Sequence, residues 1–215
     1  MDLLLTAKEL RVLGCLLEKE MATPDYYPLS LNALVNACNQ KTNRDPVVEY
    51  DEPLVREALL GLKEKGLVWQ SDAARVTKYS ENFVKTCKLL NREAAVLCML
   101  MLRGPQTVGE LRGRTERLHE FEDLEAVAAT LDALAEMNLV KKLARQPGCK
   151  ESRHAHLLAG EPEQARSPAT PAPETWGPPA APTDSPPPDL AREVAELRQE
   201  LETLKREFAA FRDQF

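Results

Sequence analysis

The residues best suited to chemistry lie in a short polar segment, residues 39–44, which reads Asn-Gln-Lys-Thr-Asn-Arg. Lys41 and Arg44 supply cations that could reach phosphates, and Asn39, Gln40 and Asn43 supply amides that could bond to phosphates or base edges. A second interpretation is open at this point. Asn-rich loops commonly use their side chains to satisfy neighbouring backbone groups, which would leave nothing for a ligand.

Two further groups of cations extend this candidate nucleic-acid interface. Arg75 and Lys78 follow the tip of a predicted hairpin. In the second half of the chain, cations follow a predicted second helix and lie on a second hairpin: Arg112, Arg114, Arg117, Lys142, Arg145, Lys150 and Arg153. The cations of the second half predict one basic stripe in which phosphate contacts dominate binding. The alternative is an ordinary solvated charged surface.

The helices that would read DNA bases argue against this function. Asp51, Glu52 and Glu57 crowd the start of one such helix, and Glu120, Glu122, Asp123 and Glu125 crowd the start of the other. A helix that enters the major groove presents donors and cations at its N-terminal end, where acidic side chains would repel phosphates. Acidic residues at a helix start also have a simple structural explanation, since they complement the helix dipole.

The sequence offers no strong catalytic or metal-binding pattern. His154 and His156 share one face of a predicted strand, and Cys149 lies nearby, but one Cys and two His without a further paired ligand is a weak zinc signal. There is no Gly-rich phosphate loop, nucleophile elbow or paired cysteine motif. We therefore expect a protein that is not an enzyme and that uses no cofactor.

An internal repeat defines the elements that must position these residues. Residues 55–68 (VREALLGLKEKGLV) align with residues 127–140 (VAATLDALAEMNLV), and Gly66 and Asn138 stand at matching helix ends where a left-handed residue is favoured. In the first half the pattern predicts a helix after the capping box Thr6–Glu9, a short helix near 30–39, a third helix from Asp51 to Gly66, and strands near 67–70 and 75–79. In the second half it predicts helices from Asn91, from the capping box Thr107–Glu110 and over 123–137, with strands near 139–145 and 152–158.

Three helices followed by a β-hairpin is the winged-helix arrangement, here expected twice. The predicted fold class is therefore mainly α with small β-hairpins (α+β), with one winged-helix domain at 1–88 and a second at 89–160. Residues 161–188 contain 10 of the 16 prolines and predict a disordered linker, because such a segment cannot form a helix interior or a sheet ladder.

The last predicted element is a coiled-coil helix over residues 189–215. Its apolar residues alternate at spacings of 4 and 3, which defines a heptad seam: Leu190, Val194, Leu197, Leu201, Leu204, Phe208, Phe211 and Phe215. Glu193, Glu200 and Glu207 would face Arg198, Lys205 and Arg212 across a parallel dimer. This favours a homodimer, and the alternative is a single amphipathic helix that folds back on the body.

Composition limits the class of protein. The net charge is -6, and residues 161–215 account for most of it with 6 basic and 11 acidic side chains, so the first 160 residues are close to neutral and any basic surface must be local. Five cysteines without close pairs suit a reducing compartment. We see no signal peptide and no apolar run long enough to span a membrane, and we expect a cytoplasmic protein.

Several longer motifs resemble one bacterial family. GCLLEKE (14–20), NACNQKTNRDPV (36–47), RVTKY (75–79), LRGPQTVGELRGR (102–114) and LARQPGCKESRHAHL (143–157) are similar to the YceH-like proteins. The resemblance covers roughly residues 3–160 and implies a pair of winged-helix domains, often followed by a C-terminal coiled segment. It implies no activity, because that family has no established biochemical role. Cys149 and the proline-rich linker depart from its pattern.

Two functions follow as hypotheses. The first is a homodimeric regulator that binds double-stranded DNA, mostly through Lys41, Arg44, Arg75 and Lys78. The second is an adaptor whose winged helices bind a protein partner in place of DNA. The basic loops and hairpins favour the first, and the acidic third helices and neutral charge favour the second.

Overall fold

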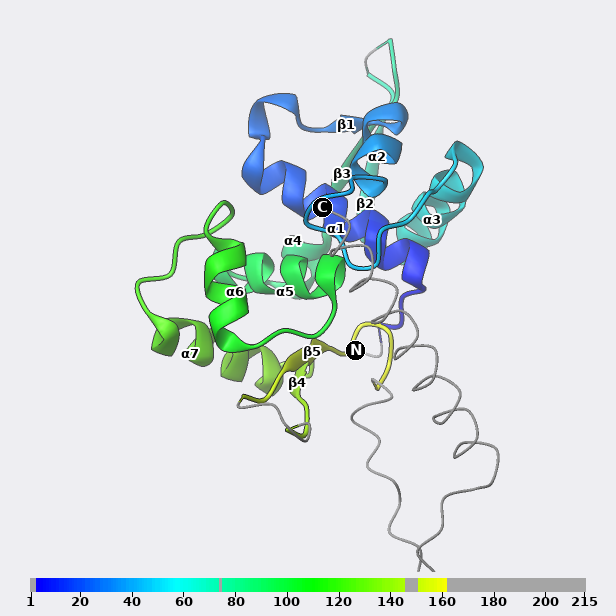
Figure 1. Ribbon diagram of the computed structural model, residues 1–215. Helices are drawn as coiled ribbons and strands as arrows, with labels where there is room; N and C mark the ends of the chain where they lie inside the picture. Colours follow the sequence, from blue (N-terminus) through cyan, green and yellow to red (C-terminus); the bar gives the residue numbers. More distant parts are fainter. Residues whose placement is uncertain (1–2, 74, 146–150, 162–215) are drawn as a thin grey trace, which may run out of the picture. The chain divides into compact units, whose positions relative to one another are not determined.

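The computed structural model describes residues 3–73, 75–145 and 151–161. All of them belong to one compact unit, residues 1–170. They form a mainly α structure with two small antiparallel sheets, which confirms the predicted α+β class (Figure 1). Residues 162–188 of the proline-rich segment, the heptad seam and Lys150 lie outside the described residues.

The first half follows the predicted order of elements. It contains α1 (Ala7–Ala22), the short 3₁₀ helix η1 (Pro24–Tyr26), β1 (Leu29–Ser30), α2 (Leu31–Cys38), α3 (Glu52–Glu64), β2 (Val68–Ser71) and β3 (Lys78–Glu81). Thr6 and Glu9 form the expected capping box, and Ser30 and Asp51 cap α2 and α3 through their side chains. The return strand begins at Lys78, three residues later than predicted, so Arg75 lies in the hairpin tip.

A short helix that the sequence pattern missed, α4 (Phe83–Cys87), leads into the second half. There α5 (Asn91–Arg103), α6 (Val108–Thr115) and α7 (Leu124–Glu136) are followed by the hairpin β4 (Val140–Lys142) and β5 (His154–His156). Gly66 and Asn138 both adopt positive φ angles, of 70° and 55°, at the ends of the third helices. The repeat seen in the sequence is therefore a repeat of three helices and a hairpin.

The first hairpin has a buried and an exposed side. In the first sheet the strand order is β1-β3-β2, with Trp69 opposite Ser80 and Ser71 opposite Lys78. Leu29, Val68 and Tyr79 occupy the alternate positions and are buried. Because side chains alternate across a strand, Trp69 and Lys78 share the outer face of this sheet.

The two halves share one hydrophobic core through the packing of α1 against α5. Gly14 of α1 makes this close approach possible, since a Cβ atom there would lie 2.9 Å from the Leu102 side chain. The Cys98 thiol donates to the Gly14 carbonyl at 3.4 Å across the same contact. The domain boundary predicted at residue 88 falls inside this unit, and the core continues across it.

Candidate nucleic-acid interface

Arg44 points into the protein. It is 6% exposed, and its guanidinium donates to the Glu18 carboxylate at 2.6 Å and to the Ala37 carbonyl at 3.0 Å. Burial opposes ionisation of Glu18, yet the hydrogen bond and charge of Arg44 hold the pKa of that carboxyl below its ordinary value. Arg44 therefore forms a structural ion pair between the 39–46 loop and α1 and is not placed to reach a phosphate.

The amides of the same loop also serve local structure. The Asn39 side chain donates to the Tyr50 carbonyl at 2.8 Å and accepts from the Tyr50 N–H at 2.7 Å. Gln40 accepts from Arg44 at 3.0 Å, and Asn43 accepts from Arg103 at 2.9 Å. These contacts support the interpretation that the polar side chains of the loop form hydrogen bonds with neighbouring groups of the protein. Lys41 remains exposed and forms no ion pair with another described residue.

The loop also covers a buried pair of thiols that sequence reasoning did not connect. Cys15 of α1 and Cys38 of α2 are both fully buried, and Arg44 donates to the Cys15 sulfur at 3.5 Å. Burial opposes ionisation of Cys15, but its hydrogen bond with Cys38 and the charge of Arg44 lower its pKa. That hydrogen bond and burial raise the pKa of Cys38. Their separation of 23 positions hides this contact in the sequence.

Cations without partners concentrate between residues 75 and 92. Arg75, Lys78, Lys85, Lys88 and Arg92 form no ion pair or side-chain hydrogen bond with any described residue. They run from the first hairpin tip through α4 to the start of α5 (Figure 1). We call them the 75–92 cations. Only Arg75 and Lys78 were predicted, although five cations in 18 residues were a signal that the sequence contained.

The outer face of the first sheet adds an aromatic ring to these cations. Trp69 is 62% exposed on β2, and Lys78 lies on the same face of β3. An exposed tryptophan beside cations provides both a stacking surface and a phosphate contact.

The exposed surface of α3 does not supply a base-reading helix. Asp51 is used as the N-cap, and Glu52 pairs with Arg56 at 2.5 Å on an exposed turn. Glu57 pairs with Lys8. The acidic start of α3 is thus explained by capping and surface pairing, and its one arginine is already engaged. In α7, Asp123 likewise caps the helix by accepting from the Ala126 N–H at 2.7 Å.

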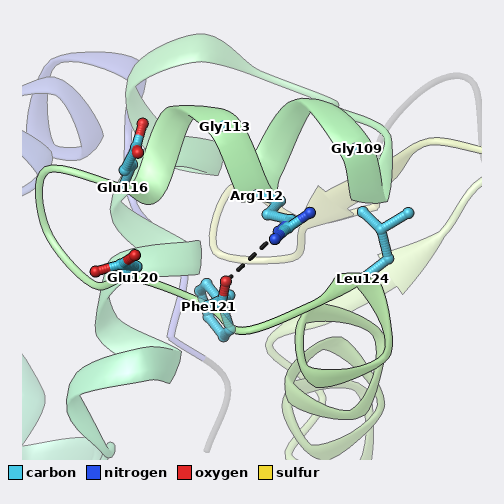
Figure 2. Close-up of a pocket in the computed structure, with 7 residues that line it drawn as sticks. All are labelled: Gly109, Arg112, Gly113, Glu116, Glu120, Phe121 and Leu124. Atoms are coloured by element: carbon cyan, nitrogen blue, oxygen red, sulfur yellow. Dashed lines mark hydrogen bonds between the residues drawn. The ribbon is translucent and has the colours of Figure 1, made fainter.

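Three of the arginines predicted for the basic stripe bind within the protein. Arg112 donates to the carbonyls of Phe121 and Glu122, at 3.5 and 2.8 Å, beside a hollow of about 340 Å³ between α6 and the 120–124 segment (Figure 2). Arg114 and Arg153 both pair with Glu110, at 3.2 and 3.1 Å. Arg117 and Arg145 are exposed and form no ion pair with a described residue. Internal contacts therefore occupy three of the six described cations of the predicted stripe, and Arg117, Lys142 and Arg145 remain unpaired among the described residues.

The histidines of β5 are half-buried. The Nδ1 atoms of His154 and His156 have no hydrogen-bond partner, and burial lowers the pKa of His156 to about 4. Among the described residues, no group of three His, Cys, Asp or Glu side chains is arranged to hold a metal. Cys149, the third residue of the weak zinc pattern, lies outside that part of the chain.

Within the described ranges, no helix combines the length and apolar character needed to cross a lipid bilayer.

Comparison with known proteins places the chain in a family. Residues 5–149 match the profile of a family described as "Protein of unknown function, DUF480". A UPF0502 protein of Solibacter usitatus is 56% identical over 216 residues and covers the full length of both chains.

Two further relatives also match the chain over most or all of its length. A UPF0502 protein of Pelobacter propionicus is 48% identical over 226 residues, again the whole of both chains, and one of Geobacter sulfurreducens is 54% identical over 177 residues, or 81% of each. These matches confirm the resemblance to an uncharacterised bacterial family. The chain therefore belongs to the DUF480 family of bacterial UPF0502 proteins.

Proposed function

We propose that this protein is a non-enzymatic pair of winged-helix modules that binds duplex DNA through its phosphates, with the first hairpin and α4 as the contact surface. The observation that carries the proposal is the set of five unpaired 75–92 cations. Elsewhere in the described part, arginines such as Arg44, Arg112 and Arg114 already bind internal acceptors. Unpaired surface cations release counterions when they meet a phosphate, which favours binding.

The same observations favour weak sequence discrimination. Because α3 presents glutamates and an arginine paired with Glu52, it has no free donors for base edges at its start. The hairpin and Lys41 would then position the protein on the backbone.

Salt-dependent binding tests this proposal. Fluorescence anisotropy of a labelled 25-base-pair duplex, titrated with the full chain between 50 and 200 mM salt, should show a steep loss of affinity. Replacing Lys78, Lys85 and Lys88 with Ala should reduce the slope of log K against log salt by about 2 to 3. A matched variant, with Arg117, Lys142 and Arg145 changed to Ala, removes the same charge and should keep most of the slope. No binding at 50 mM salt, or equal losses in both variants, would refute the proposal.

A protein-binding function is the second candidate, and Leu60 favours it. This leucine is 57% exposed on α3, with Glu57 and Glu64 nearby on the helix. An apolar centre with a charged rim is typical of a protein interface. A photo-crosslinking residue at position 60 should then capture one partner stoichiometrically, and Leu60→Glu in the full chain should abolish that partner's binding without changing DNA affinity.

Self-association through residues 189–215 is part of the proposal and rests on the sequence pattern. Changing Glu200 and Glu207 to Lys places like charges across the predicted dimer and should weaken it. Sedimentation equilibrium of the full chain measures this effect, and a monomeric wild-type protein at high micromolar concentration would exclude the dimer. The cytoplasm remains our proposed location, and the free thiols Cys15, Cys38, Cys87 and Cys98 suit a reducing environment.

A further inference from the structure

A cavity of about 360 Å³ lies where the two repeats meet. Leu17 and Met21 of α1, Val84 of α4, Ala94 of α5 and Leu118 after α6 form apolar walls. Three polar side chains complete the lining: Glu20, Glu81 and Asn91. A pocket with apolar walls and a few convergent polar groups is the usual form of a small-molecule site.

The carboxylates of this cavity have no cationic partner. The side chains of Glu20 and Glu81 are hydrogen-bonded to each other, and no lysine or arginine among the described residues forms an ion pair with either one. By contrast, Glu9, Glu18 and Glu110 each pair with a cation. The Val84 N–H donates to the Glu81 carboxylate at 2.9 Å and holds it in place. Two acids in contact without a cation leave the cavity with negative charge to be compensated.

We propose that this cavity binds a small apolar molecule that carries one protonated amine, with the ammonium group between Glu20 and Glu81. The apolar walls fit the hydrocarbon body, and the carboxyl pair is complementary to the charge. Two carboxylates and one amide are too few ligands for a calcium or magnesium ion without several waters. The inference is independent of DNA binding, because none of the 75–92 cations lines the cavity.

Proton release should accompany binding. Burial and the contact with Glu81 raise the pKa of Glu20 to about 7, so Glu20 is partly protonated at neutral pH. The other titratable groups that sense this pair are the Tyr27 hydroxyl, next to η1, and the Cys87 thiol of α4. The lining residues of α5 and the segment after α6, Asn91, Ala94 and Leu118, do not titrate. An ammonium ion favours the ionised form of Glu20 and should displace its proton.

Benzylamine and benzyl alcohol, titrated into the full chain by calorimetry at pH 6 and pH 8, test the proposal. They share an apolar body and differ in charge. Benzylamine should bind at least tenfold more tightly than the alcohol and more tightly at pH 8 than at pH 6. A further benzylamine titration at pH 7, run once in phosphate and once in Tris, should reveal release of a fraction of a proton, because the two buffers have different ionisation enthalpies.

Substitutions test whether the amine binds in this cavity. Glu20→Gln should weaken benzylamine binding at least tenfold and abolish proton release, whereas Glu64→Gln, on the exposed side of α3, should leave both unchanged. Ala94→Leu narrows the cavity without removing charge and should also weaken binding. Urea midpoints confirm that each variant is folded. Equal affinity for the alcohol, unchanged binding to Glu20→Gln, or magnesium binding that competes with the amine would each overturn the inference.

Discussion

Replacing Arg44 with methionine should destabilise the protein through the charge that it leaves behind. The Arg44 side chain is fully buried, and that of Glu18 is 10% exposed. Methionine keeps an unbranched chain but removes the donors to Glu18, Ala37 and Gln40. Breaking a buried pair by removing one partner costs about 3–5 kcal/mol. Lys19 lies 3.5 Å from the same carboxylate, so we expect the low end, about 3 kcal/mol.

Urea denaturation of the full chain, followed by circular dichroism at pH 7, measures this cost. With a slope of about 2 kcal/mol per molar urea, the midpoint should fall by about 1.5 M without a change in slope. Lys41→Met is the matched control, because it removes a cation from the exposed side of the same loop. Its effect should stay within about 0.5 kcal/mol.

A double variant separates the lost ion pair from lost packing. Glu18→Leu combined with Arg44→Met removes both charges and should recover much of the stability, since a buried ion pair is roughly balanced by its desolvation cost. The pH dependence is a further check. The pKa of Glu18 is lowered in the folded state, so the contribution of the pair is full above the ordinary value of 4.5 and is lost as pH falls below it. A single-variant cost under about 1 kcal/mol at pH 7, or a double variant less stable than the single, would refute this reasoning.

Three further predictions concern packing and titration. Gly14→Val should cost about 1–3 kcal/mol in urea unfolding, because the added carbons would meet Leu102 where α1 contacts α5, and an unchanged midpoint would contradict that packing. The pKa of Glu20 is raised to about 7 in the folded state, so the free energy of unfolding of the wild type should fall, relative to that of Glu20→Gln, as pH rises from 4.5 to 7. If the two proteins gave parallel curves of stability against pH, the contact between the two carboxyl groups would be contradicted. Burial lowers the pKa of His156 to about 4, so the unfolded protein binds more protons than the folded protein between pH 6.5 and 4. The wild type should therefore lose more stability than His156→Leu as pH falls from 6.5 to 4. An equal loss in the two proteins would refute this prediction.

Local elements could be predicted from the sequence because their signals depend on neighbouring residues. The capping boxes at Thr6 and Thr107 and the positive φ angles of Gly66 and Asn138 appear in the structure where the sequence placed them. Each depends on hydrogen bonds or sterics within a few positions of the backbone. Helix α4 and the two-residue strand β1 were missed because such short elements carry almost no periodicity.

The direction of polar side chains was decided only by tertiary structure. Lys41 and Arg44 are equivalent as cations in the sequence, but the folded loop exposes one and pairs the other with Glu18, 26 positions away. Glu20 and Glu81 meet across 61 positions for the same reason, since α1 and β3 pack together. The sequence alone determined most of the local elements and where most of them begin. Tertiary packing determined which charges pair, which remain free and where a cavity opens, because these depend on distances between residues remote in the chain.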